Sequence, residues 1–426
     1  MIKFKLLEKI HTNQASFERS KKMYETENLN KNNWDRSGLP GWTYHSEALF
    51  DLEAEELFRR RWQFVCHANE LRETGSFKTI DRVNERGFVI RDHNDEIRAF
   101  HNLCMHRGSR VIGEPEGTCK RAIFCPYHGW SYDFDGTVRG IPNRDTFGDV
   151  DFAEMGLKPL DMEIWHGLIF VRFKDSDQKS VSEILARFDD ETSLYKMDQM
   201  VPVEGSEWMD VLDANWKSVR DVDNEGYHVP QAHPALFDLY GQNYEDEPYV
   251  EGTSRSIGTF NVKPSKKWSV RSYRKILKKN NWLNLPKLQS CSWVYMGMFP
   301  NFVLGFYPDC VIYYYEYPLS ANKTIQKGGV LRHKKETREN RLARYLSGRI
   351  DRDTAKEDQM LVVWSSEAVK SSAFSGICLS DLESGVKTYH DHLRELLPVV
   401  TMQEEPKEKS LSQVNSSLLK QEFISV

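Results

Sequence analysis

The sequence has no long hydrophobic run, no strong excess of charge of one sign and few cysteines, which are odd in number. No segment approaches the roughly 18 apolar residues that a membrane-spanning helix requires. The formal net charge of −5 gives no general reason to expect binding to nucleic acid or to a membrane surface. Seven cysteines in 426 residues argue against a disulfide framework, because the number is odd and the chain is long.

The composition that remains is that of an ordinary globular protein. Hydrophobic residues make up 39% and charged residues 28% of the chain, which is long enough for two domains with a core each. The amino terminus, Met1-Ile2-Lys3-Phe4-Lys5, is followed by a polar segment and lacks the apolar core of a secretory signal. We therefore expect a cytoplasmic protein.

The hydrophobic pattern changes along the chain and predicts four regions. Residues 1–40 are polar and are interpreted as an extension, and apolar residues at helical spacing predict a helix over Ala48–Trp62. After this helix, short runs rich in Val, Ile, Phe and Tyr alternate with turn residues, which predicts a small all-β unit within residues 41–173. Helix and strand patterns mix over 174–400, and the polar residues 401–426 are expected to form a mobile tail.

Two mixed cysteine–histidine pairs are the strongest local signal in the sequence. Cys104 and His106 flank one residue, and after 18 intervening residues Cys125 and His128 flank two. Two thiolates on one iron and two imidazoles on the other make a Rieske [2Fe–2S] centre, whose neutral ligands raise its potential above that of an all-cysteine cluster. The alternative is a zinc site, but zinc fingers usually pair cysteine with cysteine and histidine with histidine. The mixed pairs therefore favour the cluster.

A second candidate metal site is the histidine pair His228 and His233. A spacing of five residues does not align two side chains on one face of a regular helix, but two prolines in this segment disturb the helix and could bring both imidazoles together. Two histidines and one carboxylate form the facial triad of Fe(II) enzymes that activate O2. The helix predicted over 354–372 offers the carboxylate, and its periodicity allows either Glu357 or Asp358 to face inward.

Over roughly residues 40 to 400 the chain resembles the α-subunit family of Rieske non-haem iron oxygenases. The resemblance rests on three segments in the right order, CMH…CPYHGW, NWKSVRDVDNEGYHVPQAH and KEDQMLVVW. It implies an α+β fold, with a small all-β Rieske domain at 41–173 and a catalytic domain at 174–400 in which helices flank an antiparallel sheet in a helix-grip-like arrangement. It also implies that Asp358, not Glu357, completes the iron site.

The resemblance gives a role to Glu225 as well. In the family, an acidic residue three positions before the first iron histidine bridges the Rieske histidine of one subunit and the iron histidine of its neighbour. Glu225 matches that position. Many ring-hydroxylating members have aspartate there, and glutamate looks more like the members that oxidise quaternary ammonium compounds. The implied assembly is a head-to-tail homotrimer, or a multiple of it, in which each iron receives electrons from a neighbour's cluster.

The activity implied by the resemblance is oxygenation of a small molecule by O2 and external electrons. Neither a glycine-rich dinucleotide fingerprint nor a second all-cysteine cluster motif appears in the sequence. A separate NAD(P)H-dependent flavin and iron–sulfur reductase, or a ferredoxin, is therefore expected as the electron donor. A Rieske electron carrier is the alternative from another class, but a long second region follows the β unit.

Two substrate classes are open, and the sequence does not decide between mono- and dioxygenation. One is hydroxylation of an N-methyl group on a betaine-like cation, with subsequent loss of formaldehyde, and Glu225 favours it slightly. Aromatic rings would attract such a cation by about 0.5–2 kcal/mol each. The other class is hydroxylation of an aromatic ring, with or without a carboxylate, in an apolar pocket. The candidate pocket residues are Tyr240, Trp293, Tyr295, Phe299 and Phe306.

Overall fold

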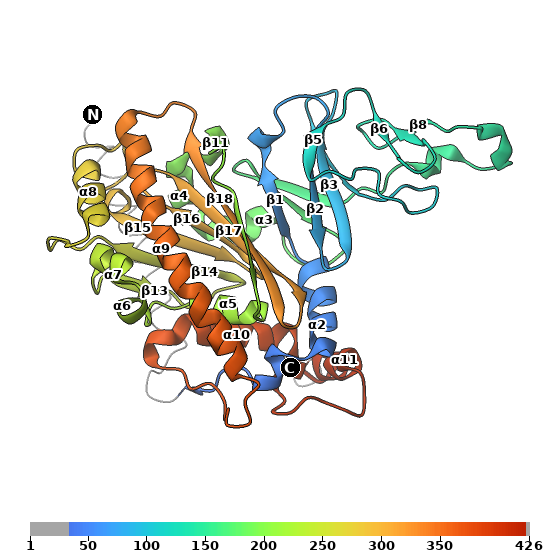
Figure 1. The fold of residues 1–426 in the computed structure, drawn as a ribbon. Helices are drawn as coiled ribbons and strands as arrows, with labels where there is room; N and C mark the ends of the chain where they lie inside the picture. The colour runs from blue at the N-terminus through green and yellow to red at the C-terminus, as the bar shows by residue number, and fades with distance from the viewer. Residues whose placement is uncertain (1–33, 423–426) are drawn as a thin grey trace, which may run out of the picture.

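The computed structural model describes residues 34–422 and shows two regions packed together (Figure 1). Most of the predicted extension, residues 1–40, lies outside the described residues. The architecture is the expected α+β arrangement, with a small all-β region beside a larger region of one long sheet and several helices. Within 34–422, no helix has both the length and the apolar character needed to cross a bilayer.

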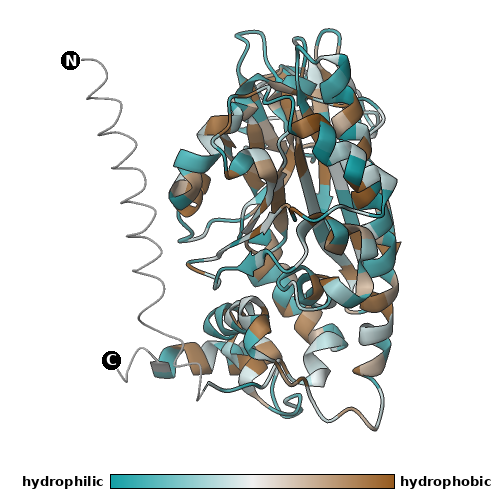
Figure 2. Ribbon diagram, turned by 90° about the vertical axis from the view of Figure 1, so that its left-hand side faces the viewer, coloured by the Kyte–Doolittle hydropathy of each residue, from teal (hydrophilic) through white to brown (hydrophobic). Residues whose placement is uncertain are grey.

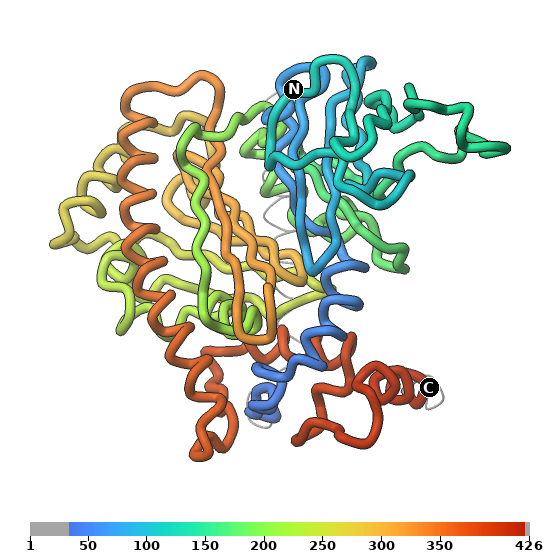
Figure 3. The backbone as a smooth tube through the Cα atoms, turned by 45° about the vertical axis from the view of Figure 1, so that its right-hand side comes forward, coloured from blue at the N-terminus to red at the C-terminus, as the bar shows by residue number. Residues whose placement is uncertain are grey.

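The first region consists of three small antiparallel sheets, as the alternation of short apolar runs and turns predicts. The order β1-β10-β9 brings the start and the end of the region together (Figure 3), and the other orders are β4-β3-β2-β5 and β6-β7-β8. The strands are β1 Gln63–His67, β2 Ser76–Arg82, β3 Glu85–Arg91, β4 Ile97–His101, β5 Glu116–Thr118, β6 Ile123–Phe124, β7 Ser131–Tyr132, β8 Val138–Gly140, β9 Asp161–Trp165 and β10 Leu168–Arg172.

The second region is built on an eight-stranded antiparallel sheet. Its order is β11-β18-β17-β16-β15-β14-β13, and β12 also pairs with β18. The strands are β11 Met200–Pro202, β12 Trp208–Leu212, β13 Tyr244–Asp246, β14 Thr253–Thr259, β15 Ser292–Met298, β16 Phe302–Phe306, β17 Val311–Ser320 and β18 Lys323–His333. The helices are α3 Val181–Leu185, α4 Asp189–Thr192, α5 Trp216–Asp223, α6 Val229–Ala232, α7 Pro234–Tyr240, α8 Trp268–Leu277, α9 Arg338–Ala368 and α10 Ser384–Leu396.

The two faces of this sheet have different neighbours. Side chains alternate between faces along a strand. On one face of β15, Val294 and Met296 pack into a core that also contains Phe64 of β1, so this core joins the two regions. On the other face, Trp293 and Tyr295 point toward α7 and α9. Figure 2 shows the hydrophobic residues of the strands behind the more hydrophilic helices. The helix-facing side of the sheet is therefore the side next to the candidate site.

The helix expected to lead the first region packs against both regions. It forms as α2 Glu47–Glu53, continued by a π-helical turn over Ala54–Arg59. Its apolar residues, including Leu49 and Phe58, share a core with Trp216 of α5 and with residues of α10. Two polar contacts accompany this core: Lys217 Nζ lies 2.6 Å from Glu53 Oε1 in a buried ion pair, and Trp216 Nε1 donates to Glu53 Oε2 at 2.8 Å.

The carboxyl-terminal segment also differs from the mobile tail predicted over 401–426. Within it, Leu411–Glu422 forms helix α11, which contacts α2 (Figure 3). Leu411 is buried, and Val414 and Leu418 pack against the same core as α2. The three residues follow one another at helical spacing. The polar composition of the segment conceals this narrow apolar stripe, and the expectation of a mobile tail is corrected for these residues.

Candidate functional site

Two loops of matching geometry hold the cysteines and histidines of the first predicted site. Gly108 N donates to Cys104 O at 2.9 Å, closing one turn. Gly129 N donates to Cys125 O at 3.1 Å, closing the other. Both glycines have a φ of +74°, which L side chains rarely adopt. The same turn is thus built twice, once at each cysteine–histidine pair.

The four side chains of these loops differ in depth. Cys104 and Cys125 are buried, whereas His106 is half-buried and His128 is exposed, with their ring centroids 4.6 Å apart. Among the described residues, three or more potential metal donors lie within 4.8 Å of one another at one place, and none of these four residues belongs to that group. The ligands of a single tetrahedral zinc ion would lie that close. The donor atoms of these four residues are spread more widely than that, which suits a two-iron cluster with thiolates inside and imidazoles toward solvent.

Aromatic residues enclose the loops. Tyr132 Oη lies 3.3 Å from Cys104 Sγ and accepts a hydrogen bond from Met105 N at 3.1 Å. Burial, and after it the bond to Cys104, raises the pKa of the Tyr132 hydroxyl, which therefore stays protonated and can donate to a thiolate. The His106 ring stacks on Trp130 with an interplanar angle of 4°. Hydrogen bonds to sulfur and a dry surrounding are features that set the potential of a cluster.

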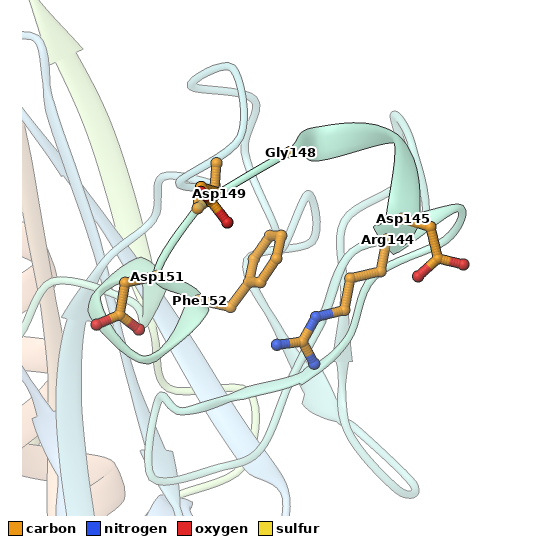
Figure 4. Close-up of a pocket in the computed structure, with 7 residues that line it drawn as sticks. Arg144, Asp145, Gly148, Asp149, Asp151 and Phe152 are labelled. Atoms are coloured by element: carbon orange, nitrogen blue, oxygen red, sulfur yellow. The ribbon is translucent and has the colours of Figure 1, made fainter.

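A shallow pocket lies in the loop next to this site (Figure 4). Figure 4 shows the Arg144 guanidinium near the Phe152 ring, and its central carbon lies 4.4 Å from the ring centroid. From the same loop, Phe147 contacts His106 at 5.7 Å between ring centroids. The pocket therefore borders the cysteine–histidine loops and is not part of the second candidate site.

The second site begins with a broken helix. His228 precedes the four-residue helix α6, and His233 ends it with φ −118° and ψ 80°, outside the helical region. The chain changes direction at His233, so the two imidazoles meet despite their spacing of five residues, with 3.0 Å between the Nε2 atoms. The helix distortion expected from the two prolines is observed.

Asp358 of α9 completes a triangle with the two histidines. Its Oδ1 atom lies 2.9 Å from His233 Nε2 and 3.5 Å from His228 Nε2. Ligand atoms held about 2.1 Å from one ion and at right angles lie about 3.0 Å apart. The three donor atoms therefore have the spacing of one face of an octahedron, which leaves the opposite positions for other ligands.

Two further carboxylates lie behind the histidines. Glu225 contacts His228 Nδ1, and Glu357 Oε2 lies 2.9 Å from His233 Nδ1. Metal-bound histidines usually donate their second N–H to such a group, which fixes the tautomer and the orientation of the ring. The periodicity of α9 left Glu357 and Asp358 open as the third ligand. In the structure Asp358 faces the Nε2 atoms, whereas Glu357 faces an Nδ1 atom.

The charges around the triangle favour a cation. Burial lowers the pKa of His228, but the hydrogen bonds to Asp358 and Glu225 outweigh it and raise the pKa to about 10. Burial raises the pKa of Asp358, and the two histidines overcome this and hold it below its usual range. Surroundings that hold a proton so firmly also attract a divalent cation. Two imidazoles and one carboxylate are a donor set that fits Fe(II).

Three of the five predicted pocket residues lie on the helix-facing side of the large sheet. Tyr240, at the end of α7, and Trp293 and Tyr295, on β15, share a core with α6 and α9. The other two lie in different cores. Phe306 points from the opposite face of the sheet into the core shared with the first region, and Phe299 packs beside α10. Strand alternation puts Phe306 on the far face, which a list of aromatic residues does not reveal.

Two residues near the site were missed by the sequence reasoning. Asp246 of β13 accepts a hydrogen bond from Gly226 N at 3.0 Å, next to Glu225. Asp351 lies on α9 seven residues before Asp358 and accepts from a tyrosine hydroxyl. The available signal for Asp351 was periodicity, because residues seven apart lie on nearly the same side of a helix.

Comparisons with known proteins match the two regions that contain these sites. Residues 61–157 match the family described as Rieske [2Fe-2S] domain, and residues 193–398 match the ring hydroxylating alpha subunit (catalytic domain). The glycine betaine monooxygenase oxygenase subunit of Chromohalobacter salexigens is 33% identical over 220 residues, which are 51% of this chain and 48% of that protein. The 2-aminobenzenesulfonate 2,3-dioxygenase subunit alpha of an Alcaligenes species is 31% identical over 192 residues, 43% of this chain and 47% of that protein.

These matches span about half the length of the curated relatives. Solved structures cover more of the chain. A quaternary ammonium Rieske monooxygenase aligns with a TM-score of 0.71 at 22% identity, over 86% of this chain and 96% of that one. Naphthalene 1,2-dioxygenase from a Rhodococcus species aligns with a TM-score of 0.68 at 19% identity, over 85% and 94% of the two chains. At these identities the likeness concerns the fold.

Proposed function

The chain belongs to the α-subunit family of Rieske non-haem iron oxygenases, and from this premise we propose that it is the terminal oxygenase of a multicomponent system. It receives electrons from a separate reductase or ferredoxin and uses O2 to hydroxylate a small organic molecule. The observation that carries the proposal is the presence of two different metal-binding geometries in one chain, the paired cysteine–histidine loops and the histidine–carboxylate triangle.

The metal ligands follow from these geometries. The proposed ligands of the Rieske cluster are Cys104, His106, Cys125 and His128. The proposed ligands of the mononuclear iron are His228, His233 and Asp358. When bound, the cluster supplies electrons and the iron supplies the activation of O2. The protein itself holds the two imidazoles in place through Glu225 and Glu357 and leaves one side of the triangle open.

Glu225 is proposed to link two subunits. The cysteine–histidine loops at β6–β8 and the histidines at α6 lie at opposite ends of the molecule (Figure 1). Tyr227, two residues after Glu225, is exposed despite its size, as are Met360 and Trp364 of α9. Large exposed apolar residues around a site mark a protein–protein contact. A head-to-tail homotrimer brings a neighbour's His106 and His128 to this surface, where Glu225 connects them to His228.

The proposed substrate is a betaine-like quaternary ammonium compound. Insertion of one oxygen atom into an N-methyl C–H bond, with two electrons and two protons taken up and the second oxygen leaving as water, gives an N-hydroxymethyl cation. This product releases formaldehyde and a proton and leaves the tertiary amine. Support comes from the glycine betaine relative and from Tyr240 and Tyr295 next to the triangle, since aromatic rings attract such cations.

Hydroxylation of an aromatic ring is the second candidate. It is favoured by one observation, the 31% identity to the 2-aminobenzenesulfonate dioxygenase subunit. The two candidates differ in the charge of the group that approaches the iron, since one is a cation and the other is a neutral ring.

A product screen separates the two. The purified protein with a surrogate reductase is given glycine betaine, choline and carnitine in one series and aromatic acids in another. We expect formaldehyde from at least one methylammonium compound and no hydroxylated aromatic product, with an Asp358→Ala protein as the inactive control. Turnover of an aromatic acid without formaldehyde from any methylammonium compound would overturn the substrate proposal.

A further inference from the structure

A row of hydroxyl groups runs from α7 to α9 on the helix-facing side of the large sheet. Tyr240 Oη lies 3.3 Å from Tyr295 Oη, which lies 3.0 Å from Tyr307 Oη. Tyr307 follows β16 and donates to Asp351 Oδ1 at 2.9 Å. The row therefore connects a helix, a strand and a loop to one carboxylate of α9.

The direction of these hydrogen bonds is fixed when Asp351 is ionised. A tyrosine hydroxyl has one proton to donate. Tyr307 donates its proton to Asp351, so it must accept from Tyr295, and Tyr295 must accept from Tyr240. Hydrogen bonds in such a chain polarise one another in the same direction. The row consequently keeps no hydroxyl proton for a ligand, whereas lone pairs on its oxygens remain available.

The row lies beside the proposed iron ligands. Asp351 and Asp358 are seven residues apart on α9, nearly two full turns, and so lie on nearly the same side of the helix. Tyr295 stays partly exposed, although Tyr240 and Tyr307 on either side of it are fully buried. Burial, and after it the charges of Asp351 and Asp358 among its neighbours, raises the pKa of Tyr295. Asp351 is also partly exposed, so Tyr295 is the one tyrosine of the row that a ligand can reach.

Asp351 is a carboxylate without a basic partner. In the described part of the chain it forms no ion pair, whereas Glu316, a buried carboxylate of β17, pairs with Arg220. Arg352 influences Asp351 only at a distance. Burial raises the pKa of Asp351 to about 7, so it is mostly ionised in mildly alkaline solution. The net charge of the row is then negative.

We propose that Asp351, acting through Tyr307 and Tyr295, makes the substrate pocket selective for a cationic head group. This inference rests on the proposed oxygenase function and names the residue that chooses the substrate class. Asp351 does not touch the substrate. It orients the hydroxyl dipoles so that Tyr295 presents its oxygen and its ring face to an ammonium group, and its charge adds to the attraction. A substrate carboxylate finds no donor in the row.

The test compares trimethylammonium compounds with molecules of the same shape that lack the positive charge. Calorimetric titration of the iron-loaded protein at pH 8, without reductase or O2, uses glycine betaine against 3,3-dimethylbutanoate and choline against 3,3-dimethylbutanol. In each pair a carbon replaces the nitrogen and removes the positive charge. We expect wild type to prefer the trimethylammonium compound of each pair by roughly tenfold or more, because the Tyr295 ring, the oriented hydroxyl groups and the charge of Asp351 all attract the positive head group.

Three variants locate the preference. In Asp351→Asn we expect the preference to disappear, because only the trimethylammonium compound binds more weakly. In Tyr307→Phe, which interrupts the row of hydroxyl groups, we expect the preference to fall strongly. Asp353→Asn, an exposed position on the same helix, should behave as wild type. Iron content and the visible spectrum of the cluster verify that each variant is loaded and folded.

Several outcomes would overturn the proposal. The first is a wild type that prefers neither member of a pair, and the second is an Asp351→Asn protein that retains the preference. The third is an equal loss of affinity for the trimethylammonium compound and for its carbon isostere, which indicates a merely structural role. Because no turnover occurs, the result is independent of the product screen. If wild type produces formaldehyde and Asp351→Asn keeps the binding preference, the proposed function stands, but Asp351 does not determine the substrate class.

Discussion

At the residue scale, neighbouring carboxylates on α9 have different contacts. Asp358 Oδ1 lies 2.9 Å from His233 Nε2, and Glu357 Oε2 lies 2.9 Å from His233 Nδ1. The two carboxylates thus approach the same imidazole from its two nitrogens. One can share a metal ion with the ring, and the other can hold the ring in place.

Substitution of the two carboxylates should therefore have unequal effects. We expect Asp358→Ala to lose the mononuclear iron and all oxygenase activity while the visible spectrum of the Rieske cluster is unchanged. Glu357→Ala should keep the iron site but bind iron roughly 10- to 100-fold more weakly, as is usual for an outer-shell partner. Iron analysis before and after dialysis measures both. If Glu357→Ala lost the mononuclear iron and Asp358→Ala retained it, Glu357 would be the iron ligand and Asp358 the residue that holds the ring.

At the element scale, helix α2 is held to α5, the helix that precedes His228 and His233. Glu53 accepts from both Trp216 Nε1 and Lys217 Nζ at the start of α5, and the side chains of Glu53 and Lys217 are each 1% exposed. Such a pair has lost its contact with water, so either partner alone would remain as an uncompensated buried charge.

Removal of Glu53 should therefore loosen α2 and α5 together. We expect Glu53→Ala to destabilise the protein by about 3–5 kcal/mol, as is typical when one partner of a buried ion pair is deleted. Asp51→Ala, an exposed position on the same helix, is the matched control and should change stability by about 0.5 kcal/mol or less. Thermal and denaturant unfolding measure the difference. Equal stability of the two variants would mean that the ion pair does not hold α2.

At the scale of the whole molecule, one core joins the two regions while the metal sites stay apart. Phe64 and Phe170 of the small β region pack with Met296 and Phe302 of the large sheet. The cysteine–histidine loops and the histidine–carboxylate triangle lie on opposite sides of this shared core (Figure 1). The shared core therefore holds the two candidate metal sites in a fixed relation to each other.

Metal analysis distinguishes an oxygenase from an electron carrier. The fully loaded chain should contain three irons and two acid-labile sulfides, because a [2Fe–2S] cluster and a mononuclear iron occupy separate sites. A carrier would contain two irons, and a zinc protein would be colourless. Treatment with a mild chelator should remove the mononuclear iron first and leave the absorption of the cluster. Loss of colour in parallel with the first iron would contradict two independent sites.

The sequence by itself determined the chemistry that depends on neighbours in the chain. The mixed cysteine–histidine pairs, the prolines around His228 and His233 and the alternation of short β runs are local features, and each is present in the structure as expected. Local spacing fixes which donor atoms can meet, so the residues favoured the cluster, whereas the family and the complete iron site were implied by the resemblance of three segments.

The tertiary structure decided which face of each element meets which neighbour. Helical periodicity allowed both Glu357 and Asp358, and strand alternation left two faces for every aromatic residue, so that Phe306 lies on the far side of the sheet from Tyr295. The docking of α2 on α5 and the packing of α11 also depend on partners far away in sequence. Periodicity defines the faces of an element, but only the packing of the whole chain assigns a partner to each face.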